Sequence, residues 1–146
     1  MADFRCEPAT PALTIVWERL VEGGETCPRC GATEEELDKA AAQLEAALRP
    51  LGIAVVLEKK ELTLEAFKGE PTASNRIWLN GRLMEDWLGG GSGASACCDV
   101  CGDEECRTVV VDGEEHEAVP AALIVRAGLA AAASLVPPPG DAACCP

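Results

Sequence analysis

Histidine and basic residues, on which many catalytic and nucleic-acid-binding sites depend, are scarce in this 146-residue sequence. His116 is the only histidine, so a metal site with several histidine ligands is excluded and a histidine base has one candidate. Twelve lysines and arginines face 25 acidic residues, which gives a formal net charge of −13. Because such a surface repels phosphate groups, we expect no binding to nucleic acid and no attachment to anionic membranes.

Long apolar runs are also missing. The longest, residues 121–136, is interrupted by Arg126 and is shorter than the roughly 20 residues that a bilayer span needs. The first residues include acidic side chains and no apolar stretch of signal-peptide length. These absences predict a cytoplasmic protein. The length suits one core, so residues 1–136 are expected to form a single domain, and the proline-rich residues 137–146 a flexible tail.

Cysteine, in contrast, is abundant. The chain has nine cysteines, an odd number that cannot be fully paired within one chain, and four of them lie between residues 97 and 106. In a reducing cytoplasm most would stay as thiols. Metal ligation or redox cycling is therefore favoured over a static disulfide framework.

The hydrophobic pattern of the first half predicts a strand, a helix and a second strand. Residues 13–21 form a β-branched and aromatic run typical of a buried strand. Thr33 and Glu36 have the spacing of a capping box, which places the start of the helix at Thr33, and Pro50 ends it. Residues 53–57 form a continuous apolar run, as in a strand buried on both faces of a parallel sheet.

The second half predicts a short helix and two hairpins before a last helix. The short helix covers residues 63–68, and the pair Asn80-Gly81 suits a type I′ turn between strands 76–79 and 82–88. The glycine-rich residues 89–93 have the composition of a flexible linker. A small hairpin is expected over residues 108–119, and Pro120 begins a helix that ends near Ala133. Residues 89–119 thus form a cysteine-rich insertion before the last helix.

The first cysteine motif is Cys27-Pro28-Arg29-Cys30, between the first strand and its helix. A Cys-x-x-Cys motif in a strand–helix–strand unit is typical of redox-active dithiols. Cys27 would be the exposed attacking thiolate, with Arg29 adding positive charge, and Cys30 the resolving thiol. With the helix beginning only at Thr33, its dipole is expected to act on these thiols less strongly than in a helix that begins at the motif.

A zinc site is the alternative for this motif. Cys27-x-x-Cys30-Gly31 and Cys98-x-x-Cys101-Gly102 share the Cys-x-x-Cys-Gly pattern of zinc knuckles. Together they supply four thiolates, enough to close one tetrahedral site. Their separation along the chain is far longer than the usual ribbon spacing, and the strand–helix–strand pattern lies between them.

The second motif concentrates soft ligands in one short segment. It contains Cys97, Cys98, Cys101 and Cys106, and thiolates select soft ions over oxygen-seeking cations. Zinc, cuprous copper, mercuric ion, arsenite or an iron–sulfur cluster all suit this set. A disulfide between the adjacent Cys97 and Cys98 would be strained and easily reduced. A structural zinc that staples the insertion is the simpler alternative.

A third pair, Cys144-Cys145, lies in the tail. A flexible tail can bring its dithiol to another site and hand over a soft ion or an electron pair. The pair resembles the C-terminal vicinal cysteines of mercuric reductases. A tail without function is the alternative.

Several motifs together resemble one cysteine-rich thioredoxin-like family of bacteria and archaea, whose function is unknown. They are Trp17, Cys27-x-x-Cys30, Arg76-Ile77-Trp78-Leu79-Asn80-Gly81-Arg82, Glu85-Asp86-Trp87 and Cys97-Cys98-x-x-Cys101-Gly102-Asp103-x-Glu105-Cys106-Arg107-Thr108. The resemblance covers residues 13 to about 131. It implies an α/β fold with a thioredoxin-like mixed sheet flanked by helices. Thioredoxin-like proteins carry a cis-proline just before the third strand, where this sequence has Ser74 and Asn75.

These observations predict cytosolic thiol–disulfide exchange or soft-metal handling, and they leave open whether the protein is an enzyme. Expected partners are a thiol reductant or a metal-transfer protein. Expected cofactors are zinc or another soft ion. A structural zinc protein that acts as an interaction module, and an iron–sulfur electron carrier, are the alternatives.

Overall fold

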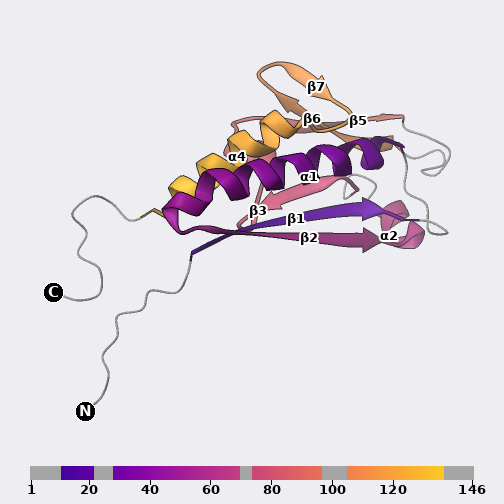
Figure 1. The fold of residues 1–146 in the computed structure, drawn as a ribbon. Helices are drawn as coiled ribbons and strands as arrows, with labels where there is room; N and C mark the ends of the chain where they lie inside the picture. Colours follow the sequence, from indigo (N-terminus) through magenta and orange to yellow (C-terminus); the bar gives the residue numbers. More distant parts are fainter. Residues whose placement is uncertain (1–10, 22–27, 70–73, 97–104, 137–146) are drawn as a thin grey trace, which may run out of the picture.

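The computed structural model describes residues 11–21, 28–69, 74–96 and 105–136. These residues form a four-stranded mixed sheet, a separate three-stranded sheet and the helices that flank them (Figure 1). The sequence-based prediction of a mixed α/β fold with flanking helices is therefore confirmed.

The four-stranded sheet has the order β2-β1-β3-β4, with β1 at Ala12–Leu20, β2 at Ala54–Leu62, β3 at Arg76–Leu79 and β4 at Arg82–Leu83. β1 pairs in parallel with β2 and antiparallel with β3, and β3 pairs antiparallel with β4. In β1 the buried Leu13, Ile15 and Trp17 alternate with partly exposed residues. One face of this strand is thus in the core, as its alternating pattern requires.

Two helices, α1 (Pro28–Leu48) and α4 (Ala121–Ala133), lie side by side over the same face of this sheet (Figure 1). Between α1 and β2, Arg49–Leu51 form one 3₁₀ turn, η1. The two helices pack tightly at Gly128, where an added Cβ would lie 2.5 Å from a methyl carbon of Leu44. The short α2 (Leu64–Gly69) is capped by Thr63, whose Oγ1 accepts the Ala66 N–H at 3.1 Å.

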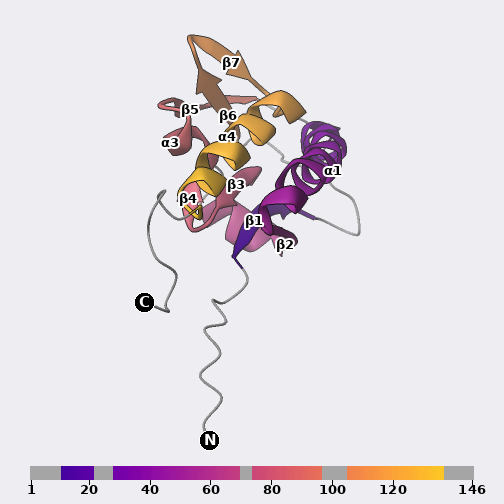
Figure 2. The ribbon, with the colours of Figure 1, turned by 60° about the vertical axis from the view of Figure 1, so that its left-hand side comes forward.

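The three-stranded sheet consists of β5 (Gly91–Ala96), β6 (Glu105–Val111) and β7 (Glu114–His116), paired antiparallel in that order. It follows α3 (Met84–Trp87) and lies beyond α4, away from β1 and β2 (Figure 2). This sheet corresponds to the predicted insertion.

Several local predictions are confirmed. The parallel β1–α1–β2 unit forms in the predicted order, and β1, the short α2 and the last helix lie within a few residues of the predicted bounds. Asn80 and Gly81 have the positive φ values, 50° and 79°, that a type I′ turn needs, and the pair Asp112-Gly113 repeats this at 54° and 81°.

Two predictions about the first strand–helix–strand unit are wrong. α1 begins at Pro28 rather than Thr33, because proline suits the first position of a helix and the Thr33 hydroxyl accepts the Val119 N–H at 3.1 Å instead of capping α1. β2 is an edge strand whose residues are mostly exposed, so it is not buried on both faces. Its apolar run covers the core on one side only.

Two predictions about the hairpin and linker are also wrong. The strand expected over residues 82–88 ends at Leu83, and Met84 and Glu85 are buried in the helical turn α3. The expected flexible linker is in part the strand β5. Its glycines allow close strand contact, since a Cβ on Gly93 would lie 2.8 Å from Thr108 Oγ1.

Candidate functional site

Cys30 is the predicted site residue that the structure describes in full. It is the third residue of α1, which follows β1 along the chain, and its side chain is 1% exposed. Its Sγ lies 3.5 Å from Oγ of Ser74, which is itself fully buried just ahead of β3. A buried thiol in hydrogen-bonding contact with a buried hydroxyl is therefore present at the start of α1.

Ser74 joins this thiol to the end of β1. Its Oγ also accepts the backbone N–H of Leu20 at 3.2 Å. The next residue, Asn75, has a φ of 69° and accepts the indole N–H of the fully buried Trp17 through Oδ1 at 2.9 Å. Asparagine tolerates this left-handed backbone conformation better than most residues. Sequence reasoning noticed Ser74 and Asn75 only as a missing proline, because a 44-residue separation hides the contact of Ser74 with Cys30.

The early start of α1 changes the electrostatics expected at the motif. Cys30 lies in the first turn of a 21-residue helix, where unpaired backbone N–H groups carry partial positive charge. The expectation of a weak dipole effect depended on a start at Thr33 and is wrong for Cys30. A helix N-terminus favours thiolate over thiol.

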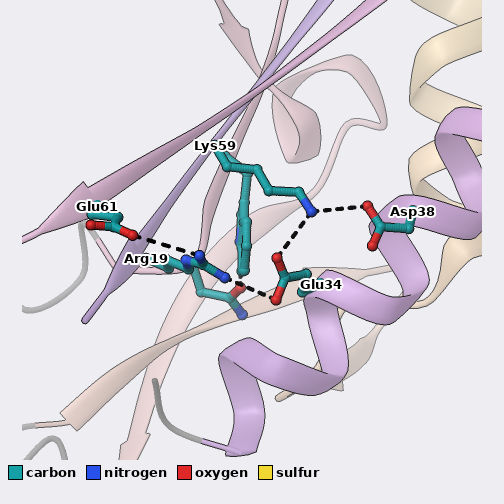
Figure 3. A network of polar contacts seen from close by, with 7 residues as sticks. Arg19, Glu34, Asp38, Lys59 and Glu61 are labelled. Atoms are coloured by element: carbon teal, nitrogen blue, oxygen red, sulfur yellow. Dashed lines mark hydrogen bonds and ion pairs between the residues drawn. The ribbon is translucent and has the colours of Figure 1, made fainter. Parts of the chain in front are cut away.

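A network of charged side chains lies one helical turn further along α1 (Figure 3). Glu34 forms ion pairs with Arg19 at 2.8 Å and with Lys59 at 2.9 Å, and Lys59 also pairs with Asp38 at 3.0 Å. The hydrogen bond from Lys59, helped by the charges of Lys59 and Arg19, outweighs burial and lowers the pKa of Glu34. Burial acts to lower the pKa of Lys59, but the hydrogen bonds and charges of Glu34 and Asp38 outweigh it and raise that pKa.

These two shifts predict a pH dependence of stability. The contribution of Glu34 is present above its ordinary pKa of 4.5 and is lost as pH falls through the lowered value. The contribution of Lys59 is present below 10.5 and is lost as pH rises through the raised value. We expect Lys59→Met to reduce stability at pH 7 but to flatten the loss on acidification below pH 4.5, measured by urea unfolding at several pH values. Lys39→Met is the control, because Lys39 contacts Glu36 at 3.7 Å on an exposed part of the same helix. An unchanged acid slope for Lys59→Met would contradict the prediction.

Two hydrogen bonds hold the base of the insertion, and one of them reaches the N-terminal part of α1. The Ser95 hydroxyl donates to Glu117 Oε1 at 3.3 Å, and two residues later the Val119 N–H donates to Thr33 on α1. Thr33 lies three residues, close to one helical turn, after Cys30. In the β5–β6 register Ser95 is opposite Cys106. The end of the hairpin from which residues 97–104 extend is thus connected to the helix that carries Cys30.

A buried ion pair fixes the other side of the insertion. Arg107 of β6 pairs with Glu85 of α3, and both side chains are almost fully buried. Both residues belong to motifs of the sequence, Glu85 to Glu85-Asp86-Trp87 and Arg107 to the cysteine-rich segment. Their opposite charges were the only signal in the sequence for this pairing.

The other predicted site residues lie outside the described part of the chain. The structure does not describe segment 22–27, which contains Cys27, or segment 97–104, which contains Cys97, Cys98 and Cys101. It also does not describe residues 137–146, which contain Cys144 and Cys145. Cys106 is placed in β6 by its backbone alone. Within the described residues, no group of three or more histidine, cysteine or acidic side chains is arranged to hold a metal ion.

The described chain is thus an α/β protein with a mixed sheet, a buried cysteine at the start of its first helix and an added three-stranded sheet. The sequence matches the model of the family described as "Domain of unknown function (DUF2703)" over residues 13–128. The protein belongs to this family.

An archaeal relative supports this assignment. An uncharacterized protein of Archaeoglobus fulgidus is 52% identical over 112 residues, which cover 77% of this chain and 82% of the relative. The expectation of a family of unknown function with archaeal members is therefore confirmed. No solved structure matches. Among the described residues, no helix is both long and apolar enough to span a membrane.

Proposed function

We propose that this protein is a thioredoxin-like thiol–disulfide exchange protein that uses Cys27 and Cys30. The observation that carries the proposal is the position of Cys30, buried in the first turn of α1 against Ser74. The sheet order β2-β1-β3-β4, with α1 and α4 over one face, supports a thioredoxin-like fold. The buried position suits a resolving thiol, because a resolving thiol has to meet only its neighbour in the motif.

The exchange proceeds in two balanced steps. The Cys27 thiolate attacks a disulfide of a partner molecule, forms a mixed disulfide and releases one partner thiolate, which takes up a proton. The Cys30 thiolate then attacks the Cys27 sulfur, closes the Cys27–Cys30 bond and releases the second partner thiolate. The dithiol is oxidised by two electrons and the partner disulfide is reduced. The proposal places the protein in the cytoplasm, where a thiol reductant restores the dithiol.

Thiol trapping across a series of dithiol buffers tests this proposal. Trypsin cleaves after Arg29, so the peptides 20–29 and 30–39 report Cys27 and Cys30 separately after differential alkylation and reduction. We expect both to change together with one midpoint potential. Cys30→Ser is expected to leave Cys27 in an unresolved mixed disulfide, whereas the control Cys6→Ser, outside the motif, leaves the midpoint unchanged. Cysteines that stay reduced across the whole range, or stay bound to metal, would overturn the assignment.

A second candidate function is soft-metal handling by Cys97, Cys98, Cys101 and Cys106, with zinc, copper, mercury, arsenic or an iron–sulfur cluster as the bound species. It is favoured by the hydrogen bond from the Val119 N–H to Thr33, which joins the base of the insertion to the helix that carries Cys30. Cys144-Cys145 would act as the delivering pair, through contact with a metal-transfer partner.

Metal content tests this second candidate. We expect the double substitution Cys98→Ser/Cys101→Ser to remove most bound soft metal, because a hydroxyl is a poor ligand for soft ions. Elemental analysis of protein purified without added metal gives the stoichiometry, and visible absorbance separates an iron–sulfur cluster from zinc. Cys144→Ser/Cys145→Ser is the matched control for the loss of two thiols. An unchanged stoichiometry in the first double variant would exclude the loop as the metal site.

A further inference from the structure

Three segments that are distant in the sequence meet at Ser74. They are the end of β1 at Leu20, the first turn of α1 at Cys30 and the residue Ser74 that leads into β3. Ser74 is fully buried and Cys30 is 1% exposed. A buried hydroxyl held between a backbone N–H and a thiol has little freedom to turn elsewhere.

We infer that Ser74 is a positioning residue that stabilises the thiolate form of Cys30 by donating a hydrogen bond to its sulfur. The inference rests on the proposed thiol–disulfide exchange, in which Cys30 must lose its proton before it attacks Cys27.

The direction of this hydrogen bond follows from the groups present. The Leu20 N–H occupies one acceptor position of Ser74 Oγ, at 3.2 Å, and leaves the hydroxyl hydrogen free to point elsewhere. A thiol can donate to Oγ or accept from it, but a thiolate can only accept. When Cys30 is deprotonated, the Ser74 hydroxyl therefore donates across the 3.5 Å contact. A donor on one side of a hydroxyl strengthens the bond that it donates on the other side.

Burial makes this hydrogen bond consequential. A thiolate removed from water is disfavoured unless groups in the protein replace its solvation. Charged side chains on the elements that meet here include Glu34 and Asp38 of α1, Arg19 and Glu18 of β1, Lys59 and Glu61 of β2, and Arg76 of β3, and these pair with one another. The Ser74 hydroxyl and the backbone N–H groups of the first turn of α1 are neutral donors that favour the thiolate.

The test measures the rate at which Cys30 of the reduced full-length protein is alkylated at different pH values, read from peptide 30–39. We expect Ser74→Ala to move the pH midpoint of alkylation upward by about one pH unit, the effect of losing one hydrogen bond to a charged group. Ser74→Thr, which keeps the hydroxyl, restores the wild-type midpoint. The midpoint potential of the Cys27–Cys30 pair shifts with Ser74→Ala in the direction that favours the disulfide, because the reduced thiolate form loses its donor.

Thr33→Val is the matched control. Thr33 is also a fully buried hydroxyl that accepts a backbone N–H, that of Val119, at 3.1 Å. A loss of packing or local stability alone would change the alkylation rate at every pH in both variants and leave the midpoint in place.

Each outcome decides the inference. An unshifted midpoint in folded Ser74→Ala, or an equal shift in Thr33→Val, overturns it even where the Cys27–Cys30 disulfide forms. Absence of that disulfide in all buffers overturns the proposed function instead. If Ser74→Ala does not fold by circular dichroism, the wild-type midpoint decides: a value well above the ordinary thiol range near pH 8.5 contradicts a stabilised thiolate, because burial alone raises it.

Discussion

Glu85→Ala is expected to lower the free energy of unfolding by about 3–5 kcal/mol, the cost of removing one member of a buried charge pair. Glu85 is 2% exposed and Arg107 is 6% exposed, so both charges of the pair are shielded from bulk water. The pair joins β6 of the insertion to α3, the helical turn that precedes the insertion. Urea unfolding in the presence of a reductant, followed by tryptophan fluorescence, measures the effect.

The control is an ion pair of the same type on the surface. Arg126 and Asp112 are 3.0 Å apart with both side chains exposed, and Arg126→Ala is expected to cost less than about 1 kcal/mol. The double substitution Glu85→Met/Arg107→Met is expected to recover most of the lost stability, because apolar side chains need no partner. If Glu85→Ala costs no more than Arg126→Ala, the buried pair does not anchor the insertion.

Leu44→Ala is expected to cost about 2–5 kcal/mol, because it opens a cavity between α1 and α4. Leu44 is fully buried, and its two methyl carbons lie 2.5 and 2.7 Å from the position that a Cβ on Gly128 would occupy. Gly128→Ala alone overfills the same space and is expected to cost about 1–3 kcal/mol. In the double variant the new methyl group occupies part of the cavity, so its cost is expected to be less than the sum of the single costs.

A second helical glycine provides the control. Among the residues that the structure describes, no atom beyond the adjoining part of α1 lies within 4 Å of a Cβ added to Gly31, so Gly31→Ala is expected to stabilise the protein by up to about 1 kcal/mol through helix propensity. Strict additivity of Leu44→Ala and Gly128→Ala in chemical denaturation would show that the two residues do not share one space.

The sequence predicted the elements that depend on neighbouring residues. The β-branched and aromatic run of β1, the helical spacing in α1 and the turn pair Asn80-Gly81 are local signals, and the structure follows them. The errors concern positions where a distant residue competes with the local signal. Thr33 has the spacing of a helix cap, but the Val119 N–H, 86 residues away, takes its hydroxyl.

The candidate site divides in the same way. Cys30 was predicted, because the spacing of Cys-x-x-Cys between a strand and a helix is a local pattern. Ser74 was missed as a partner of Cys30, and so was the Glu85–Arg107 pair, because single sequences carry no signal for contacts between distant segments. The roles of Cys27, Cys97, Cys98, Cys101, Cys106, Cys144 and Cys145 stay predictions.

By itself the sequence determined the α/β class, the order of most elements, the acidic surface and the wealth of thiols, since composition and periodicity are properties of the chain alone. Only the tertiary structure decided that β2 is an edge strand and that α1 begins at Pro28. It placed some of the glycines in residues 89–93 in the strand β5, which pairs with β6. It also decided that a hydroxyl of the segment before β3 contacts the Cys30 sulfur. The reason is physical: burial and hydrogen bonding are satisfied by whichever groups the folded chain brings together, and they override local preferences where the two differ.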